Sequence, residues 1–182
     1  RAMGIYQSSF WDSIYKPESR EIARVLGVDQ MQLVEGEALK SADLKDMLVY
    51  WNKVRDGMPL PVASSLNPAH ISRHLSEVFL LQVEYDPLKF TFRLIGEDPT
   101  TAFGVNASGL EVESIMSEGV QAGKMMHDLY AWIVEQRQPM SFSGPNPTLK
   151  EGYNFHEVVY LPFSEGGANI VRILGAGVYD RV

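Results

Sequence analysis

Apolar residues recur with the helical period in two long segments of the chain, residues 41–56 and 117–136. The first segment places its apolar side chains at the spacing i, i+3, i+4 and i+7 of one helix face: Leu44, Met47, Leu48 and Trp51. Ser41 is a favourable N-cap for this helix, and Gly57 is a favourable stop. We therefore expect the helix to pack its apolar stripe on the body of the domain.

Segments of alternating or β-branched apolar residues predict five strands. Residues 78–85 and 89–95 are predicted to form a hairpin across the turn Asp86-Pro87. Three further β-prone segments close the chain, at about 139–144, 153–162 and 169–179. The sequence therefore predicts an α+β fold, a five-stranded antiparallel sheet with helices on one face, plus N-terminal helices.

The first forty residues are patterned less regularly than the rest. Ile22, Val25 and Leu26 lie at helical spacing before Gly27. We divide the chain into a partly helical N-terminal extension, residues 1–40, and a domain, residues 41–182, that includes the leading helix. Since helices on one face leave the other face of the sheet uncovered, we expect the extension to cover it. The residues expected on that other face are Thr91, Arg93, Ile95, Val159 and Val171.

Composition and charge narrow the function classes. The chain has 182 residues and no cysteine, which excludes disulfides, zinc–thiolate sites and thiol nucleophiles. The net charge is −7 and no run of Lys and Arg is present, so nucleic-acid binding is not expected. The longest apolar runs, such as residues 78–81, are too short to span a bilayer, and no secretory pattern opens the sequence. We expect a cytoplasmic protein that does not contact a membrane.

Several short motifs, in their order and spacing, resemble one known family. They are residues 50–57 (YWNKVRDG), Asn67-Pro68, residues 78–81 (VFLL), residues 90–96 (FTFRLIG) and Phe103-Gly104 followed by Gly109. Over about residues 43–179 the chain resembles the PAS fold, and more narrowly compact bacterial PAS-domain proteins with an N-terminal helical extension. The resemblance implies a sensory or regulatory module that is usually cytoplasmic and often dimeric. It implies no shared ligand and no shared catalytic residue.

Three histidines are candidates for metal or haem binding. His70 and His74 lie four residues apart on a predicted helix, where both rings could face one metal ion, but the sequence supplies no third ligand in a recognisable pattern. His127 lies in the long helix and is the candidate axial ligand for haem. One histidine without a further haem signal is weak support, so we expect neither a metal ion nor haem.

The apolar and aromatic residues of the domain permit two interpretations. PAS domains commonly place ligands between the sheet and the helices, and methionines and aromatic residues make adaptable pocket walls. These residues either fill the core or line a ligand-sized cavity, since the two cases look alike in sequence. The candidate ligand-binding residues are Phe92, Leu94, Phe103, Met126, Leu129, Tyr130, Ile133, Phe142, Tyr153 and Tyr160.

The sequence contains no Gly-x-Ser-x-Gly motif and no phosphate-binding glycine loop. We therefore predict a non-enzymatic sensory or regulatory PAS-like module that binds a small molecule, a signalling protein partner, or both. Two other classes stay open: a small α+β enzyme of a cone-like fold, and a structural dimerisation adaptor. We further expect a homodimer in which the extension takes part, by packing on the sheet of the partner. The alternative is that the extension folds back entirely on its own sheet and the protein stays monomeric.

Overall fold

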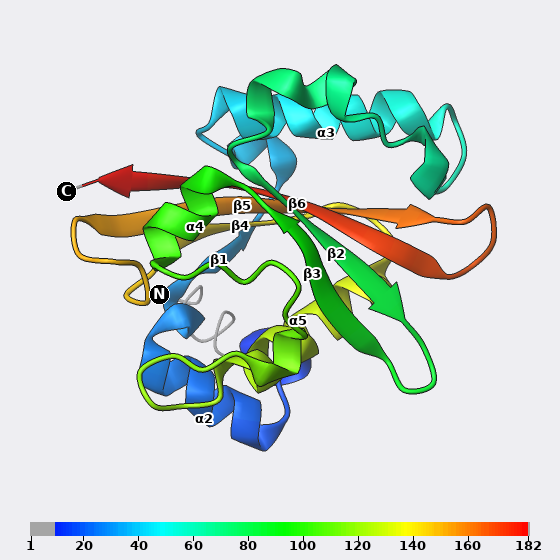
Figure 1. Cartoon of the computed structure of the whole chain (residues 1–182). Coiled ribbons are helices and arrows are strands. Elements are labelled where there is room, and N and C mark those ends of the chain that lie inside the picture. The colour runs from blue at the N-terminus through cyan, green and yellow to red at the C-terminus, as the bar shows by residue number, and fades with distance from the viewer. Residues whose placement is uncertain (1–9, 182) are drawn as a thin grey trace.

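A six-stranded antiparallel sheet forms the centre of the molecule (Figure 1). The computed structural model describes residues 10–181. The strands lie side by side in the order β1-β4-β5-β6-β2-β3. Their bounds are Gln32–Val34 (β1), Val78–Glu84 (β2), Lys89–Ile95 (β3), Met140–Pro145 (β4), Tyr153–Ser164 (β5) and Ile170–Arg181 (β6). The predicted α+β class and PAS-like sheet are confirmed, with one strand more than the sequence analysis counted.

The additional strand comes from the N-terminal extension. β1 pairs antiparallel with β4 and places Leu33 opposite Phe142. Three residues are too few to show a clear alternation of apolar and polar side chains, which is why periodicity alone does not predict this strand. The division of the chain after residue 40 stays a prediction, although β1 lies in the same sheet as the domain's own strands.

Helices cover both faces of the sheet (Figure 1). The α-helices are Pro17–Leu26 (α2), Ala42–Arg55 (α3), Glu97–Phe103 (α4) and Ala122–Gln136 (α5). Short 3₁₀ helices join them: Val28–Gln30 (η1), Gly36–Ala38 (η2), Ala63–Ser65 (η3), Pro68–His74 (η4) and Val112–Ser114 (η5). α3 and η4 lie on one side of the sheet, and α2 and α5 lie on the other. No helix within residues 10–181 is both long enough and apolar enough to cross a bilayer.

The predicted packing of α3 on the sheet is confirmed. Leu44 and Met47 are fully buried, and Trp51 is 4% exposed. The indole Nε1 of Trp51 donates a hydrogen bond of 2.8 Å to the carbonyl oxygen of Pro162 on β5. At the start of the helix, Ser41 Oγ accepts from the backbone N–H of Leu44, as expected of an N-cap.

A buried carboxylate from the sheet contacts the N-terminus of α3. Glu157 on β5 is 2% exposed, and its Oε1 and Oε2 each accept from the backbone N–H of Lys40, at 3.2 and 2.9 Å. Oε1 also accepts from the N–H of Ser41 at 2.9 Å. A carboxylate at a helix N-terminus accepts hydrogen bonds from backbone N–H groups and interacts favourably with the positive end of the helix dipole. This contact therefore holds the start of α3 against the sheet.

The helix of the extension, α2, lies on the opposite side of the sheet from the one predicted. α2 packs against α5, with Ile22 and Leu26 buried and Val25 59% exposed. The face that the extension was expected to cover is covered by α3 instead (Figure 1). A β-bulge between Leu80 and Leu81 also shifts the pairing with β3, so Ile95 faces the helices α5 and α2 and not α3.

The long helix begins five residues later than the sequence predicted, at Ala122. Ser117 and Val120 instead close a tight turn in which Glu118 and Gly119 have positive φ. Gly123 is required for close packing, because a Cβ atom there would lie 2.1 Å from the carbonyl oxygen of Val112. The first turn of α5 therefore lies directly against η5.

Candidate functional site

A cavity of about 310 Å³ lies between the sheet and the helices on the α5 side. The sheet supplies one wall through β2, β3, β4, β5 and β6, and α5, α4 and the extension supply the others. Side chains alternate between the two faces of a strand, so on β5 the residues His156, Val158 and Tyr160 face the cavity while Glu157 faces α3. The core is therefore not completely filled on this side.

Aromatic rings in edge-to-face contact form much of the cavity wall. The ring of Tyr160 lies 5.7 to 6.0 Å from the rings of Tyr130, Phe79 and Phe142. Trp11 of the extension stacks on Phe142 at 5.6 Å, and its indole Nε1 donates to the carbonyl oxygen of Met31. Rings that contact one another in this way have little freedom to move into the space between them.

One end of the cavity is polar, and His156 lies there. Asn146 Oδ1 accepts from the backbone N–H of Thr148, which orients the Asn146 amide so that its Nδ2 donates to His156 Nδ1 at 3.3 Å. Because Nδ1 accepts, the proton of the neutral ring is on Nε2. Nε2 is buried and has no hydrogen-bond partner among the described residues. Burial lowers the pKa of His156 to about 3, so the ring is neutral at physiological pH.

Gly177 on β6 makes room for this polar end. A Cβ atom at residue 177 would lie 2.6 Å from the hydroxyl of Tyr179 and 3.1 Å from Nε2 of His156. The rings of Tyr179 and His156 stack with centroids 4.7 Å apart. The Tyr179 hydroxyl and the His156 Nε2–H therefore both lie over Gly177, where any side chain would clash with them.

The described part of the cavity wall carries no formal charge. Among the lining residues within 10–181 there is no Lys, Arg, Asp or Glu. Burial raises the pKa of the tyrosines that line it, Tyr15, Tyr130, Tyr160 and Tyr179, above the usual value for a phenol. Their hydroxyls are therefore protonated across the physiological range.

The cavity brings together most of the candidate residues named from the sequence. Those that line it are Phe92, Phe103, Met126, Leu129, Tyr130, Phe142 and Tyr160. Leu94 is 47% exposed, Ile133 is fully buried in the core, and the Tyr153 hydroxyl contacts Arg181. The β-bulge leaves Arg93 of β3 without a partner on β2, which turns Leu94 outward and Ile95 inward. Whether any of these residues binds a ligand stays a prediction.

Sequence reasoning missed the part of the wall that comes from the extension and from the ends of β5 and β6. Trp11, Tyr15 and Met31 line the cavity. Trp11 and Tyr15 lie four residues apart, at the spacing of one helix face, which is the signal that could have grouped these two residues. His156 also lines the cavity. The signal that could have identified it is its place two residues before Val158 and four before Tyr160, on the same face of one strand.

The three histidine candidates named from the sequence, His70, His74 and His127, lie outside the cavity wall. The ring of His127 contacts Phe90 at 5.2 Å, and its Nδ1 lies 3.2 Å from a Glu113 carboxylate oxygen. The ring of His70 is exposed and contacts Tyr50. His70 and His74 do not share one helix face as their spacing would permit, because Ile71 between them is non-helical and breaks the helical spacing.

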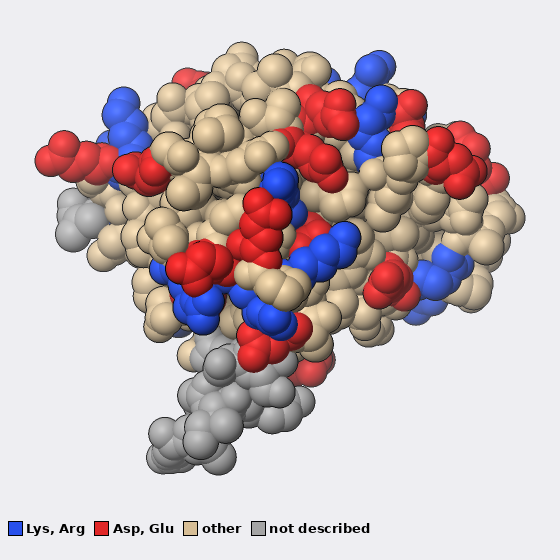
Figure 2. Space-filling model, turned by 90° about the horizontal axis from the view of Figure 1, so that it is seen from below, with Lys and Arg blue, Asp and Glu red and all other residues tan. Residues whose placement is uncertain are grey.

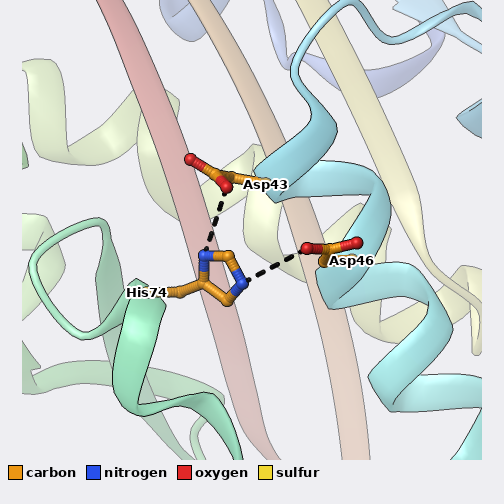
Figure 3. Close-up of side chains that lie close together, drawn as sticks. All are labelled: Asp43, Asp46 and His74. Atoms are coloured by element: carbon orange, nitrogen blue, oxygen red, sulfur yellow. Dashed lines mark ion pairs between the residues drawn. The ribbon is translucent and has the colours of Figure 1, made fainter.

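His74 is buried beside acidic side chains on the other side of the sheet (Figure 3). Asp43 and Asp46 of α3 approach its two ring nitrogens, and Glu77 approaches Nδ1. Burial, followed by the nearby Asp43 carboxyl group, raises the pKa of Glu77 to about 8. The cluster joins α3 to the end of η4.

On the face that carries α2 and α5, acidic and basic side chains are intermixed (Figure 2). Lys124 of α5 pairs with Glu18 of α2 at 2.9 Å, and Arg20 lies 3.7 Å from Asp12. Exposed pairs of this kind contribute little to stability. This face therefore does not present the one-sided positive field that a polyanion would need.

A model of the PAS domain family matches residues 39–178 of the chain. The match includes α3, the sheet from β2 to most of β6, and α4 and α5 between them. No curated protein and no solved structure matches the chain.

Proposed function

Since this chain belongs to the PAS domain family, whose members are sensory or regulatory modules, we propose that it senses a small, uncharged, largely apolar molecule that binds in the cavity. The observation that carries the proposal is the space between the sheet and α5, in which no charged side chain lies among the described lining residues. Its volume of about 310 Å³ is at the lower end of the range for small-molecule sites, about 300–1,000 Å³. A ligand about the size of two fused or linked rings fits this volume.

The chemistry of the wall favours a neutral ligand. A charged group moved from water into this space would lose its hydration without gaining an opposite charge, which is strongly unfavourable. The unpartnered Nε2–H of His156 favours a ligand with one hydrogen-bond acceptor at that end. An acceptor there would satisfy a buried donor that is otherwise unpaired.

A pair of related dyes tests this proposal. N-phenyl-1-naphthylamine is neutral, and 1-anilinonaphthalene-8-sulfonate has a similar ring system with a sulfonate added. We expect saturable fluorescence enhancement with the neutral dye and binding at least about tenfold weaker with the sulfonate, since burying the anion costs more than about 1.4 kcal/mol.

Filling the cavity from β5 is expected to abolish binding of the neutral dye. Val158→Phe adds a ring on the cavity side, where Val158 is 2% exposed. The matched control is Val49→Phe on α3, where the side chain is 67% exposed and faces solvent. Equal dye binding by the two variants, with both folded by circular dichroism, would contradict binding in this cavity.

We also propose that the protein forms a homodimer. The apolar side chains of α2 that were expected at a partner, Ile22 and Leu26, are buried within the same chain. We propose that any contact of the extension with a second copy uses its exposed residues, such as Val25 and Leu33. Light scattering of the full chain at tens of micromolar tests this. A dimer weakened by Val25→Glu supports the proposal, and a monomer contradicts it.

A further inference from the structure

The side-chain cluster between α3 and η4 lies on the side of the sheet away from the cavity. His74 lies between Asp43 and Asp46, and the two carboxylates belong to adjacent turns of α3 (Figure 3). One donor atom from each of the three residues lies within 4.8 Å of the other two. Such an arrangement requires α3 to be docked, because His74 comes from a different element.

The histidine is buried but is not hydrogen-bonded at Nδ1. The residue is 6% exposed, and Nδ1 has no hydrogen-bond partner among the described residues. Its nearest acidic neighbours are Asp43 Oδ1 at 3.7 Å and Glu77 Oε2 at 3.5 Å, and Oε2 is itself buried without a hydrogen-bond partner. These separations exceed the usual 2.7–3.2 Å or so of a hydrogen bond.

Asp43 and Asp46 approach different ring nitrogens, so the spacing around any one ring nitrogen extends up to 4.8 Å and must shorten when the three groups share a cation. Two donors that each lie about 2.0–2.2 Å from one metal ion are roughly 3.4 Å apart in a tetrahedral site. Asp43 and Asp46 are 44% and 52% exposed, so their carboxylates can rotate and an ion can enter from solvent.

We propose that His74, Asp43 and Asp46 bind a divalent transition-metal cation such as Zn²⁺, with Glu77 adjacent as a further carboxylate. One imidazole nitrogen with two carboxylates suits a borderline cation, whereas Mg²⁺ and Ca²⁺ prefer oxygen ligands alone. The remaining coordination positions are open to water or to Glu77. Only one ring nitrogen of His74 ligates a given ion, and the cation joins α3 to η4.

Titration of the full chain with Zn²⁺, followed by calorimetry and by thermal unfolding, tests this site. We expect one saturable site and a rise in the unfolding midpoint of roughly 5–10 °C at a hundredfold excess over the dissociation constant. Asp46→Asn removes one ligand at a half-exposed position where folding is not at risk, and His74→Gln removes the nitrogen. Each variant should bind Zn²⁺ at least about tenfold more weakly.

The controls are Glu37→Gln, an exposed acid on η2, and His70→Gln, an exposed histidine on η4. Both should retain the affinity and the rise in midpoint. Two results would overturn the proposal: no saturable binding to the unaltered chain, or equal binding by Asp46→Asn and Glu37→Gln. The second result would assign the bound Zn²⁺ to other surface groups and leave the cluster as an ion-pair network. Asp46→Asn should bind the neutral dye in the cavity as the unaltered chain does. The metal-site proposal and the cavity proposal can therefore be contradicted independently of one another.

Discussion

Replacement of Trp51 by alanine is expected to lower the free energy of unfolding by about 3–5 kcal/mol. The indole is 4% exposed and lies between α3 and β5, so its removal leaves a space that the surrounding residues fill only in part. It also removes the hydrogen bond to the carbonyl oxygen of Pro162 and the contact with the Arg55 guanidinium, 5.6 Å from the ring. Urea unfolding followed by circular dichroism measures the loss.

Two further substitutions separate the causes of this effect. Trp51→Phe keeps an aromatic ring but leaves the Pro162 carbonyl without its donor, and it should cost about 1–3 kcal/mol. Val49→Ala lies on the exposed side of the same helix and should change stability by less than about 0.5 kcal/mol. A loss within error of zero for Trp51→Ala would contradict the docking of α3 on the sheet.

The second large effect is a loss of stability in mild acid that depends on His156. Its pKa is lowered by burial to about 3 in the folded protein, against about 6.5 in an unfolded chain. As the pH falls below about 6.5, the unfolded state takes up a proton that the folded state does not. Stability from this residue is therefore complete above about pH 6.5, and it falls by about 1.4 kcal/mol for each pH unit below that.

Comparison of the chain with His156→Gln measures this effect. Between about pH 7 and about pH 5, the unaltered protein should lose roughly 2 kcal/mol more stability than the variant, because glutamine does not titrate. The matched control His70→Gln removes an exposed imidazole and should retain the pH dependence of the unaltered chain. If the unfolding free energy depends on pH equally in the unaltered chain and in His156→Gln, then water reaches this ring and burial does not lower its pKa.

The elements with strong periodicity could be predicted from the sequence almost to the residue. α3 was predicted at 41–56 and lies at Ala42–Arg55, and β3 was predicted at 89–95 and lies at Lys89–Ile95. Local patterns determine such elements because one face is buried along their whole length. The start of α5 was predicted too early, since the positive φ of Glu118 and Gly119 is set by a turn that hydrophobic spacing does not report.

The features that need long-range contacts could not be predicted. β1 pairs with β4, more than one hundred residues later in the chain, and Glu157 contacts the N-terminus of α3 across a similar separation. The cavity also depends on contacts between residues far apart in the sequence. Whether aromatic residues fill a core or enclose a space depends on how Trp11, Tyr160 and α5 meet in three dimensions. The identities of the residues do not decide it.

The most direct test of a neutral ligand in this cavity uses the methionine methyl groups as reporters. Met116, Met125 and Met126 line the cavity. Met47 of α3 is buried on the other side of the sheet, and Met58, which follows α3, is exposed. Titration of methyl-labelled protein with N-phenyl-1-naphthylamine, followed by nuclear magnetic resonance, is predicted to shift the methyl signals of the first three residues to saturation and to leave those of Met47 and Met58 in place. Saturating shifts confined to Met47 and Met58, or no shift in any of the five, would contradict the proposed function.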